Sequence, residues 1–344
     1  MADNDRIPGN HVNIIKPLSI LPILLFLISA PALAQHAGTT EPAYVPQRVF
    51  VADGKKFSDF ESMLADLARA DMVFVGEQHD DPATHRLERA ILEGVLRRRN
   101  GPVAVAMEMF ERDVQPVIDD YFAGKISEEE FLKKSRPWPR YATDYRPVVE
   151  FARQHGWKLV ASNVPRPLAS RVSRGGLAEI DKLAPADRAH VAEKLSCPMD
   201  DYFKRFAETM SSHPGASAHG AAKPEAPKDK ATLEKEAAEM KAMIERFYYA
   251  QCAKDETMGD SVARVVNTEA KPLVIHYNGA FHSDFGYGTA DRAKQRAGKA
   301  RMRIVSIVPV DNLDTIKAAE YRKRGDYIVF CLQARKPKEE KRAE

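Results

Sequence analysis

The chain lacks several short motifs that identify common enzyme classes. Its 344 residues contain no G-x-G-x-x-G, no Walker motif, no H-E-x-x-H, no C-x-x-C and no G-x-S-x-G. These absences exclude the usual signatures of dinucleotide folds, P-loop NTPases, zincins, thioredoxin-like redox centres and α/β-hydrolases. No segment of the sequence repeats. Function must therefore be argued from residues that are distant in sequence.

The chain also lacks an excess of charge of one sign. Lys and Arg total 52 and Asp and Glu total 49, so the formal net charge is +3. A nucleic-acid-binding protein presents a concentrated basic face. The even balance argues against nucleic acid as a partner, and the charged run at 336–344 is interpreted as a solvated tail.

Cysteine is scarce as well, with only three residues in the chain. Cys331 lies inside an apolar strand pattern, which indicates a small core residue. Cys197 and Cys252 border the same helical region and are the plausible pair for a disulfide in an oxidising compartment. The alternative, that all three thiols are free, stays open at this point.

The only long apolar run lies near the start of the chain. Arg6 and Lys16 precede the apolar stretch 18–28, and small residues follow up to Ala34. A basic region, an apolar region and an A-x-A site are typical of a secretory signal peptide, here 1–34 with cleavage before Gln35. An uncleaved anchor helix is the alternative. No lipobox cysteine follows, so we expect a periplasmic protein without a lipid anchor.

Short β-rich runs alternate with helical patterns along the rest of the chain. The strands are expected at 72–75, 103–107, 157–161, 273–277, 303–308 and 327–332. Apolar strands separated by helices are typical of a mostly parallel sheet covered on both faces. We predict an α/β fold, an open mostly parallel sheet, over residues 49–335, after a flexible segment at 35–48.

The strand signal disappears between Asn163 and Thr268. Residues 177–195, 200–210 and 232–267 show helical patterns, the last with apolar side chains at helical spacing. A stretch at 211–230 is rich in Ala, Gly, Pro and Ser and has little to bury. The sequence therefore predicts an inserted helical lid at about 165–268 that contains a mobile loop.

Ionisable side chains follow several of these strands. Glu77 and His79 come after the first strand, Glu108 after the second, and His282 soon after the strand at 273–277. Ligands of open α/β sheets bind beyond the carboxyl ends of the strands. We expect these four side chains to face one another and to bind a divalent metal ion such as zinc, iron or manganese. The supporting residues are His85, Asn163, Asn278 and Asp284.

Three motifs resemble the ChaN family of bacterial iron-regulated, haem-binding proteins. They are G-E-Q-H-D-D-P-x-x-H at 76–85, M-E-M-F at 107–110 and N-G-x-F-H at 278–282. ChaN proteins share a superfamily with erythromycin-esterase-like and Tiki-like members. The resemblance spans about Val49 to Leu332 and implies haem bound between a helical region and the sheet, in a dimer that serves iron uptake. It also implies a haem-uptake receptor as a partner.

The residue that would ligate the haem iron stays open among several candidates. Tyrosine and histidine are both established haem ligands. The candidates in and near the helical region are Tyr141, Tyr145, Tyr202, His213, Tyr248 and Tyr249. For each tyrosine the alternative is a half-buried aromatic side chain.

Two functions follow from these patterns. The first is a non-enzymatic haem-binding protein of iron acquisition. The second is a metal-dependent hydrolase, in which Glu77 and His79 would be catalytic and the wider superfamily supplies the analogy. A third interpretation is an exported scaffold whose polar residues at strand ends only cap helices.

Overall fold

The computed structural model describes residues 44–212 and 229–333. The expected signal peptide, most of the expected loop with His213, and the expected charged tail lie outside the described residues. Within the described part of the chain, no helix combines the length and the apolar character needed to cross a membrane.

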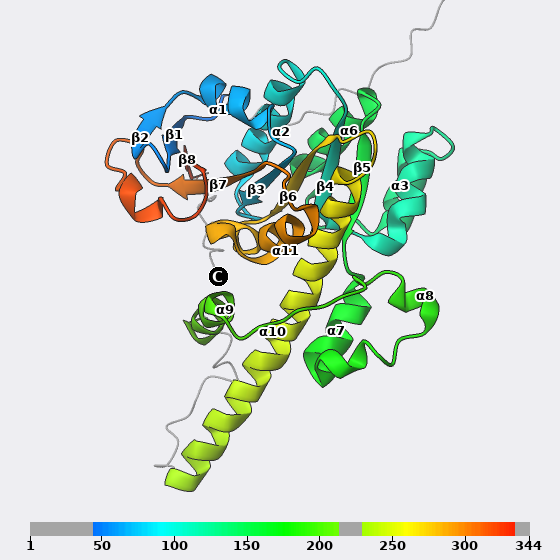
Figure 1. The fold of residues 1–344 in the computed structure, drawn as a ribbon, viewed down its shortest axis with the longest axis vertical. Coiled ribbons are helices and arrows are strands. Elements are labelled where there is room, and N and C mark those ends of the chain that lie inside the picture. Colours follow the sequence, from blue (N-terminus) through cyan, green and yellow to red (C-terminus); the bar gives the residue numbers. More distant parts are fainter. Residues whose placement is uncertain (1–43, 213–228, 334–344) are drawn as a thin grey trace, which may run out of the picture. The chain divides into compact units, whose positions relative to one another are not determined.

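Eight strands form one open sheet, as Figure 1 shows. They are β1 (Gln47–Val51), β2 (Lys56–Ser58), β3 (Met72–Glu77), β4 (Val103–Glu111), β5 (Lys158–Asn163), β6 (Leu273–Gly279), β7 (Met302–Val310) and β8 (Tyr327–Leu332). Their order across the sheet is β2-β1-β8-β7-β3-β6-β4-β5. The six strands from β8 to β5 pair in parallel, and β1 pairs antiparallel with both β2 and β8. The predicted open, mostly parallel α/β sheet is confirmed.

The central strands are buried on both faces because helices cover each side. On one face, Val73, Val105 and Ile275 pack against residues of α1 (Phe60–Leu67), α2 (Pro82–Leu96) and α6 (Arg146–Gln154). On the other face, the alternate residues Phe74, Ala104 and Val274 pack against α10 (Lys230–Val266) and α11 (Gly288–Ala297). Figure 1 shows these two helical layers. Successive side chains of each strand point to opposite faces and therefore pack into two separate cores.

The remaining helices connect or extend these layers. They are α3 (Gln115–Phe122), α4 (Glu128–Ser135), α5 (Tyr141–Asp144), α7 (Arg166–Gly175), α8 (Pro185–Arg188) and α9 (Asp201–Ser212). Of these, α7 to α9 lie with α10 between β5 and β6, where the described residues contain no strand. The predicted helical stretch therefore contains helices α7 to α10.

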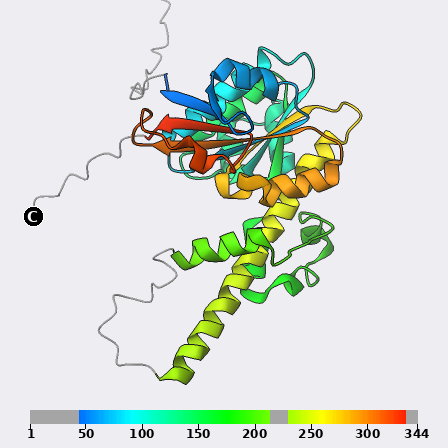
Figure 2. The ribbon, with the colours of Figure 1, turned by 60° about the vertical axis from the view of Figure 1, so that its left-hand side comes forward.

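A small core of its own holds α9 against α10. Tyr202 and Phe206 of α9 pack on Ile244, Tyr248 and Cys252 of α10. Figure 2 shows α9 beside the part of α10 that lies away from the sheet. The C-terminal part of α10, by contrast, packs on the sheet through Val262 and Val266. One 37-residue helix thus belongs to two cores.

Three expectations need correction. Strands β1 and β2 were not expected, and since β1 begins at Gln47, the flexible segment predicted for 35–48 is wrong at its end. The predicted helix at 177–195 is wrong, because only the short 3-10 turn at Leu177–Glu179 and α8 form there. The strands at the site are also longer than expected, so Glu77, Glu108 and Asn278 end or lie within strands rather than follow them.

Candidate functional site

The carboxyl ends of β3, β6 and β4 bring the predicted ligands to one edge of the sheet. Glu77 pairs in register with Gly279 of the neighbouring strand β6. On the other side of β6, the register of β4 shifts after Met107, so Glu108 lies in an irregular stretch of its strand. From there Glu108 Oε2 accepts a hydrogen bond of 2.8 Å from the backbone N–H of Gly279. Strand geometry alone therefore brings both carboxylates toward β6.

The two histidines complete two separate pairs. His79 Nδ1 makes a short contact with Glu77 Oε1, and His282 Nε2 lies 3.3 Å from Glu108 Oε1. A Cβ atom on Gly279 would stand 2.6 Å from His79 Nε2, so the ring occupies the space that a larger residue would fill. The four predicted residues share one edge, but they form two pairs rather than one compact set of ligand atoms.

His282 is held between two buried carboxylates. Its Nδ1 lies 2.6 Å from Asp255 Oδ1, on the side of the ring opposite Glu108. Burial alone would lower the pKa of His282, but the charges of Glu108 and Asp255 raise it to about 10. The same interaction holds the pKa of Glu108 below its usual value despite burial. At neutral pH His282 is therefore an imidazolium with both ring nitrogens engaged.

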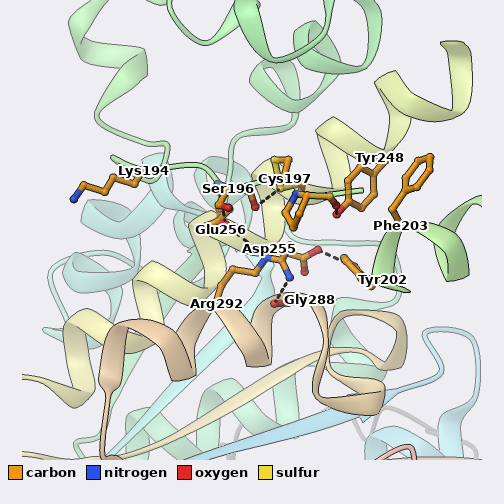
Figure 3. Close-up of a disulfide and its surroundings, with 12 residues drawn as sticks. Lys194, Ser196, Cys197, Tyr202, Phe203, Tyr248, Asp255, Glu256, Gly288 and Arg292 are labelled. Carbon is orange, nitrogen blue, oxygen red and sulfur yellow. Dashed lines mark hydrogen bonds and ion pairs between the residues drawn. A yellow bond between two sulfur atoms is a disulfide. The ribbon is translucent and has the colours of Figure 1, made fainter. Parts of the chain in front are cut away.

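Asp255, on α10, connects the helical segment between β5 and β6 to this site through its contact with His282. Its Oδ2 accepts a hydrogen bond of 2.7 Å from the Tyr202 hydroxyl, and its Oδ1 also accepts one from Thr289. Figure 3 shows Asp255 and Tyr202 near the disulfide. That disulfide joins Cys197 and Cys252, and the predicted pairing is confirmed. Cys331 is free and buried in β8, also as predicted.

A third cluster lies beside Glu77, and its centre is His85, which the sequence predicted only as a supporting residue. His85 Nδ1 lies 3.0 Å from Glu88 Oε2 and 3.2 Å from Glu77 Oε2. Of the described residues, only these three bring one potential metal-ligand atom each within 4.8 Å of the others. The predicted support His85 is thus central, and Glu88 is new. Its one signal in the sequence is the three-residue spacing from His85, which places both on one helix face.

Burial and mutual contact shift the ionisation of this cluster strongly. Burial would raise the pKa of Glu77, but hydrogen bonds with His79 and His85 lower it to about 2. Burial would lower the pKa of His85, but the two glutamates raise it to about 11. Burial and repulsion from Glu77 raise the pKa of Glu88 well above its usual range. Such shifts are typical of functional sites, although structural ion pairs produce them too.

The other supporting residues order the strand ends. Asn163 Nδ2 donates to the backbone oxygen of Glu108 at 3.0 Å. Asn278 donates to Ser283 Oγ and interacts with His276. Asp284 is buried and faces Arg324 at 3.6 Å, and burial raises its pKa to about 6.

Four of the tyrosine candidates are buried: Tyr141, Tyr145, Tyr202 and Tyr248. The Tyr145 hydroxyl donates to Glu77 Oε1 at 3.1 Å, and that of Tyr248 donates to the Pro198 carbonyl at 2.7 Å. Burial raises the pKa of Tyr248 to about 12 and those of the other three as well. Tyr249 is the described candidate that is only half-buried. His213 lies outside the described residues.

Comparison with known proteins assigns this arrangement to a family. The family described as haem-binding uptake, Tiki superfamily, ChaN matches residues 63–293. The match includes the ends of β3, β4 and β6 and most of the helical insert. A comparison with curated proteins finds no match.

Solved structures share the fold at low sequence identity. ChaN of Campylobacter jejuni, whose structure concerns cofacial haem binding, is 17% identical with a TM-score of 0.58, covering 83% of this chain and 96% of its own. A Bacillus cereus protein is 12% identical with a TM-score of 0.42, covering 79% and 91%. A mutant erythromycin esterase in its open conformation is 15% identical with a TM-score of 0.40, covering 86% and 85%. The last two are too distant to bear on function. The family match covers most of the chain, which therefore belongs to the ChaN family of the Tiki superfamily, the haem-binding uptake proteins.

Proposed function

We propose that this protein binds haem on the exposed face of its helical insert and serves haem or iron acquisition. The observation that carries the proposal is a row of exposed apolar side chains on α10. Leu233, Met240 and Phe247 are 53%, 37% and 36% exposed, although all three are large and apolar. Membership of a haem-binding family supports the same conclusion.

The spacing of this row makes it a surface rather than three scattered residues. Each member follows the last by seven residues, which is about two helical turns, so all three lie on one face of α10. The row extends over roughly 21 Å of helix. Single exposed apolar residues are common, whereas several on one helix face indicate a binding surface. A porphyrin ring is flat and apolar and would cover such a strip.

The accessible candidates for an iron ligand are few among the described residues. Four tyrosine candidates are buried, with raised pKa values that disfavour tyrosinate. Met240 belongs to the exposed row, whereas Tyr249 is half-buried on the opposite side of α10, where it packs toward α7. Both side-chain types ligate haem iron in known proteins. His213 stays a prediction because it lies outside the described residues.

A second copy of the chain would complete the site. The structure of Campylobacter jejuni ChaN concerns cofacial haem binding, an arrangement in which two haems face each other. Two copies related by a two-fold axis would each present the same row and thereby enclose two haems. We therefore propose a homodimer that forms on haem loading. The signal-peptide pattern supports a periplasmic location, where a haem-uptake receptor would be the donor.

Titration of the purified chain with hemin tests the proposal. We expect a saturable Soret shift at micromolar hemin and a dimer in sedimentation experiments only after loading. Met240→Ala should alter the Soret spectrum or weaken binding, whereas Tyr249→Phe should not, because Tyr249 lies on the opposite side of α10. Met199→Ala and Tyr44→Phe are matched controls, since both residues are exposed and lie outside the row. The absence of a shift, or an identical titration after the double change Leu233→Ser and Phe247→Ser, would refute haem binding on this face.

The second candidate function is metal-assisted hydrolysis at the strand ends. One observation favours it: His79 pairs with buried Glu77 while its own side chain is 45% exposed, so it alone of the four reaches solvent. The strand-end residues form two separate pairs rather than one compact set of ligand atoms, which counts against a single metal ion shared by all four. Hydrolysis of an activated ester, lost in His79→Ala, would support this function, whereas no turnover with any added divalent metal would remove it.

A further inference from the structure

The cluster beside Glu77 has no role in the proposed haem surface. Glu77 is the last residue of β3, while His85 and Glu88 lie one turn apart on α2. Asp81 caps the start of that helix by accepting hydrogen bonds from the N–H groups of Ala83 and Thr84. The cap fixes where α2 begins, and therefore which of its side chains point at the end of β3. All three cluster residues are at most 3% exposed.

The arrangement leaves carboxylate oxygens without hydrogen bonds. Among the described residues, Glu88 Oε1 is buried and has no hydrogen-bond partner, and Glu77 Oε2 has only the ion-pair contact of 3.2 Å with His85 Nδ1. A buried polar atom in that state costs about 1–3 kcal/mol, and more when it carries charge. Two buried carboxylates this close also repel each other. One imidazole ring between them provides a single Nδ1 for both. Two carboxylates thus face one imidazole nitrogen.

The distances from His85 Nδ1 to the two carboxylates match those between ligands of one small cation, and all three atoms lie within 4.8 Å of one another. Metal–ligand bonds to His nitrogen and carboxylate oxygen are about 2.0–2.2 Å long. Two such ligands at angles of 90–110° stand roughly 3.0–3.4 Å apart. The two separations from His85 Nδ1 are 3.0 and 3.2 Å. The cluster is thus already spaced as a set of ligands.

The surroundings of His85 also resemble those of a metal ligand. A ligating histidine usually donates its second ring N–H to a carbonyl or carboxylate, which fixes its orientation. His85 Nε2 lies 3.3 Å from the backbone oxygen of His79 and 3.5 Å from Asp144 Oδ2. The hydroxyl of Tyr145 meanwhile donates to Glu77 Oε1 and orients that carboxylate. The outer groups therefore contact His85 Nε2 and Glu77 Oε1, whereas His85 Nδ1 and Glu77 Oε2 face the cluster.

We propose that Glu77, His85 and Glu88 form a buried site for one small divalent cation, separate from the haem surface. Two carboxylates and one imidazole suit manganese, iron or zinc, because oxygen and imidazole ligands favour these ions over soft metals. The site also differs from the predicted set at the strand ends, with which it shares only Glu77. It has one imidazole, whereas the strand-end set has two.

Metal binding by the haem-free chain provides the test. The chelator-stripped protein is dialysed against Mn²⁺ or Zn²⁺ alone and analysed for metal content, affinity and thermal stability. We expect one equivalent per chain and a higher melting temperature with metal. Glu88→Gln should weaken binding about 100-fold or more, since it removes a ligand. Glu93→Gln on the exposed side of the same helix is the matched control and should bind as the wild type does.

A measurement on the wild-type chain tests the site even if Glu88→Gln fails to fold. Electron-spin-echo spectra of the Mn²⁺-loaded wild-type chain should show coupling to the nitrogen of a single imidazole. His282→Gln should retain the metal. Coupling to two imidazoles, loss of the metal in His282→Gln with retention in Glu88→Gln, or uptake of less than about a tenth of an equivalent would each overturn the proposal.

Discussion

Asp255 Oδ1 lies 2.6 Å from His282 Nδ1, and this contact connects the long helix of the insert to the end of β6. Both side chains are buried, and His282 also lies 3.3 Å from Glu108 Oε1 and 3.3 Å from Gln251 Nε2. The insert is therefore coupled to the strand-end cluster by a charged hydrogen bond. A substitution at Asp255 should therefore affect both the packing of α9 against α10, through Tyr202, and the ionisation of His282.

Replacing Asp255 by Asn should destabilise the folded state. It should also lower the pKa of His282, because the imidazolium loses one of its two carboxylate partners. The carboxylate accepts from Tyr202, His282 and Thr289, and an amide cannot accept all three while presenting its own N–H groups. Breaking a buried ion pair on one side costs about 3–5 kcal/mol. Denaturant unfolding measures this loss, and NMR should show the pKa of His282 falling from about 10.

The control for this change is Asp201→Asn, which breaks an exposed ion pair with Lys204 and should leave the unfolding curve unchanged. A wild-type His282 that titrates at its ordinary value of 6.5 would contradict the coupling.

Reduction of the disulfide should loosen the insert before the sheet. Cys197 and Cys252 are 55 residues apart, and the loop they close includes α9. Losing such a link typically costs about 2–4 kcal/mol. We expect proteolysis to begin around α9 in Cys252→Ala, while hydrogen exchange in β3 and β6 stays slow. The denatured, unreduced chain should contain one reactive thiol, that of Cys331, and three after reduction. Three thiols before reduction would exclude the link.

The ends of the central strands were predictable because each strand is a continuous apolar run. Such runs mark buried parallel strands, and the residues after them must meet at one edge. Glu77, Glu108 and His282 were found in this way. The edge strands β1 and β2 were missed because they are short and only partly buried, so their pattern is weak.

The strand-end pattern could not predict Glu88 and Asp255, for two different physical reasons. Glu88 follows no strand, and its role depends on how far α2 is rotated toward the sheet, which the cap at Asp81 and the packing of Ile91 determine. Asp255 lies 27 residues before His282, on a helix whose face toward β6 becomes evident only when α11 is in place. Tertiary packing decides both.

Gly259→Ala should destabilise the fold even though alanine favours helices. A Cβ atom at this position would stand 2.6 Å from Arg292 Cβ and 2.8 Å from the backbone nitrogen of Ala293. Overpacking of that kind costs about 1–3 kcal/mol or more, against a gain in helix propensity of about 1 kcal/mol. Thermal melts measure the net loss. Gly101→Ala, where the nearest atom is 3.5 Å away, is the matched control. A raised melting temperature for Gly259→Ala would mean that α10 and α11 lie farther apart.

His276 should make the fold sensitive to mild acid. It is fully buried in β6, with Nδ1 2.9 Å from Asn278 Oδ1 and Nε2 3.0 Å from Ser162 Oγ. Burial lowers its pKa from 6.5 to about 4, so the folded state keeps the ring neutral where the unfolded chain already binds a proton. Stability is therefore lost as pH falls from 6.5 towards 4, at up to roughly 1.4 kcal/mol per pH unit.

His276→Asn removes the group that titrates, so comparison with the wild type isolates the contribution of His276 to the pH dependence of stability. The variant is less stable than the wild type at pH 7.5, because it loses packing and one hydrogen bond. The stability difference between wild type and variant should then shrink by about 3 kcal/mol between pH 7 and pH 4, because only the wild type bears the cost of keeping the ring neutral. Urea unfolding across this range measures the difference. A difference that stays constant or widens as the pH falls would show that His276 is already protonated in the fold, with Asn278 and Ser162 both accepting from it.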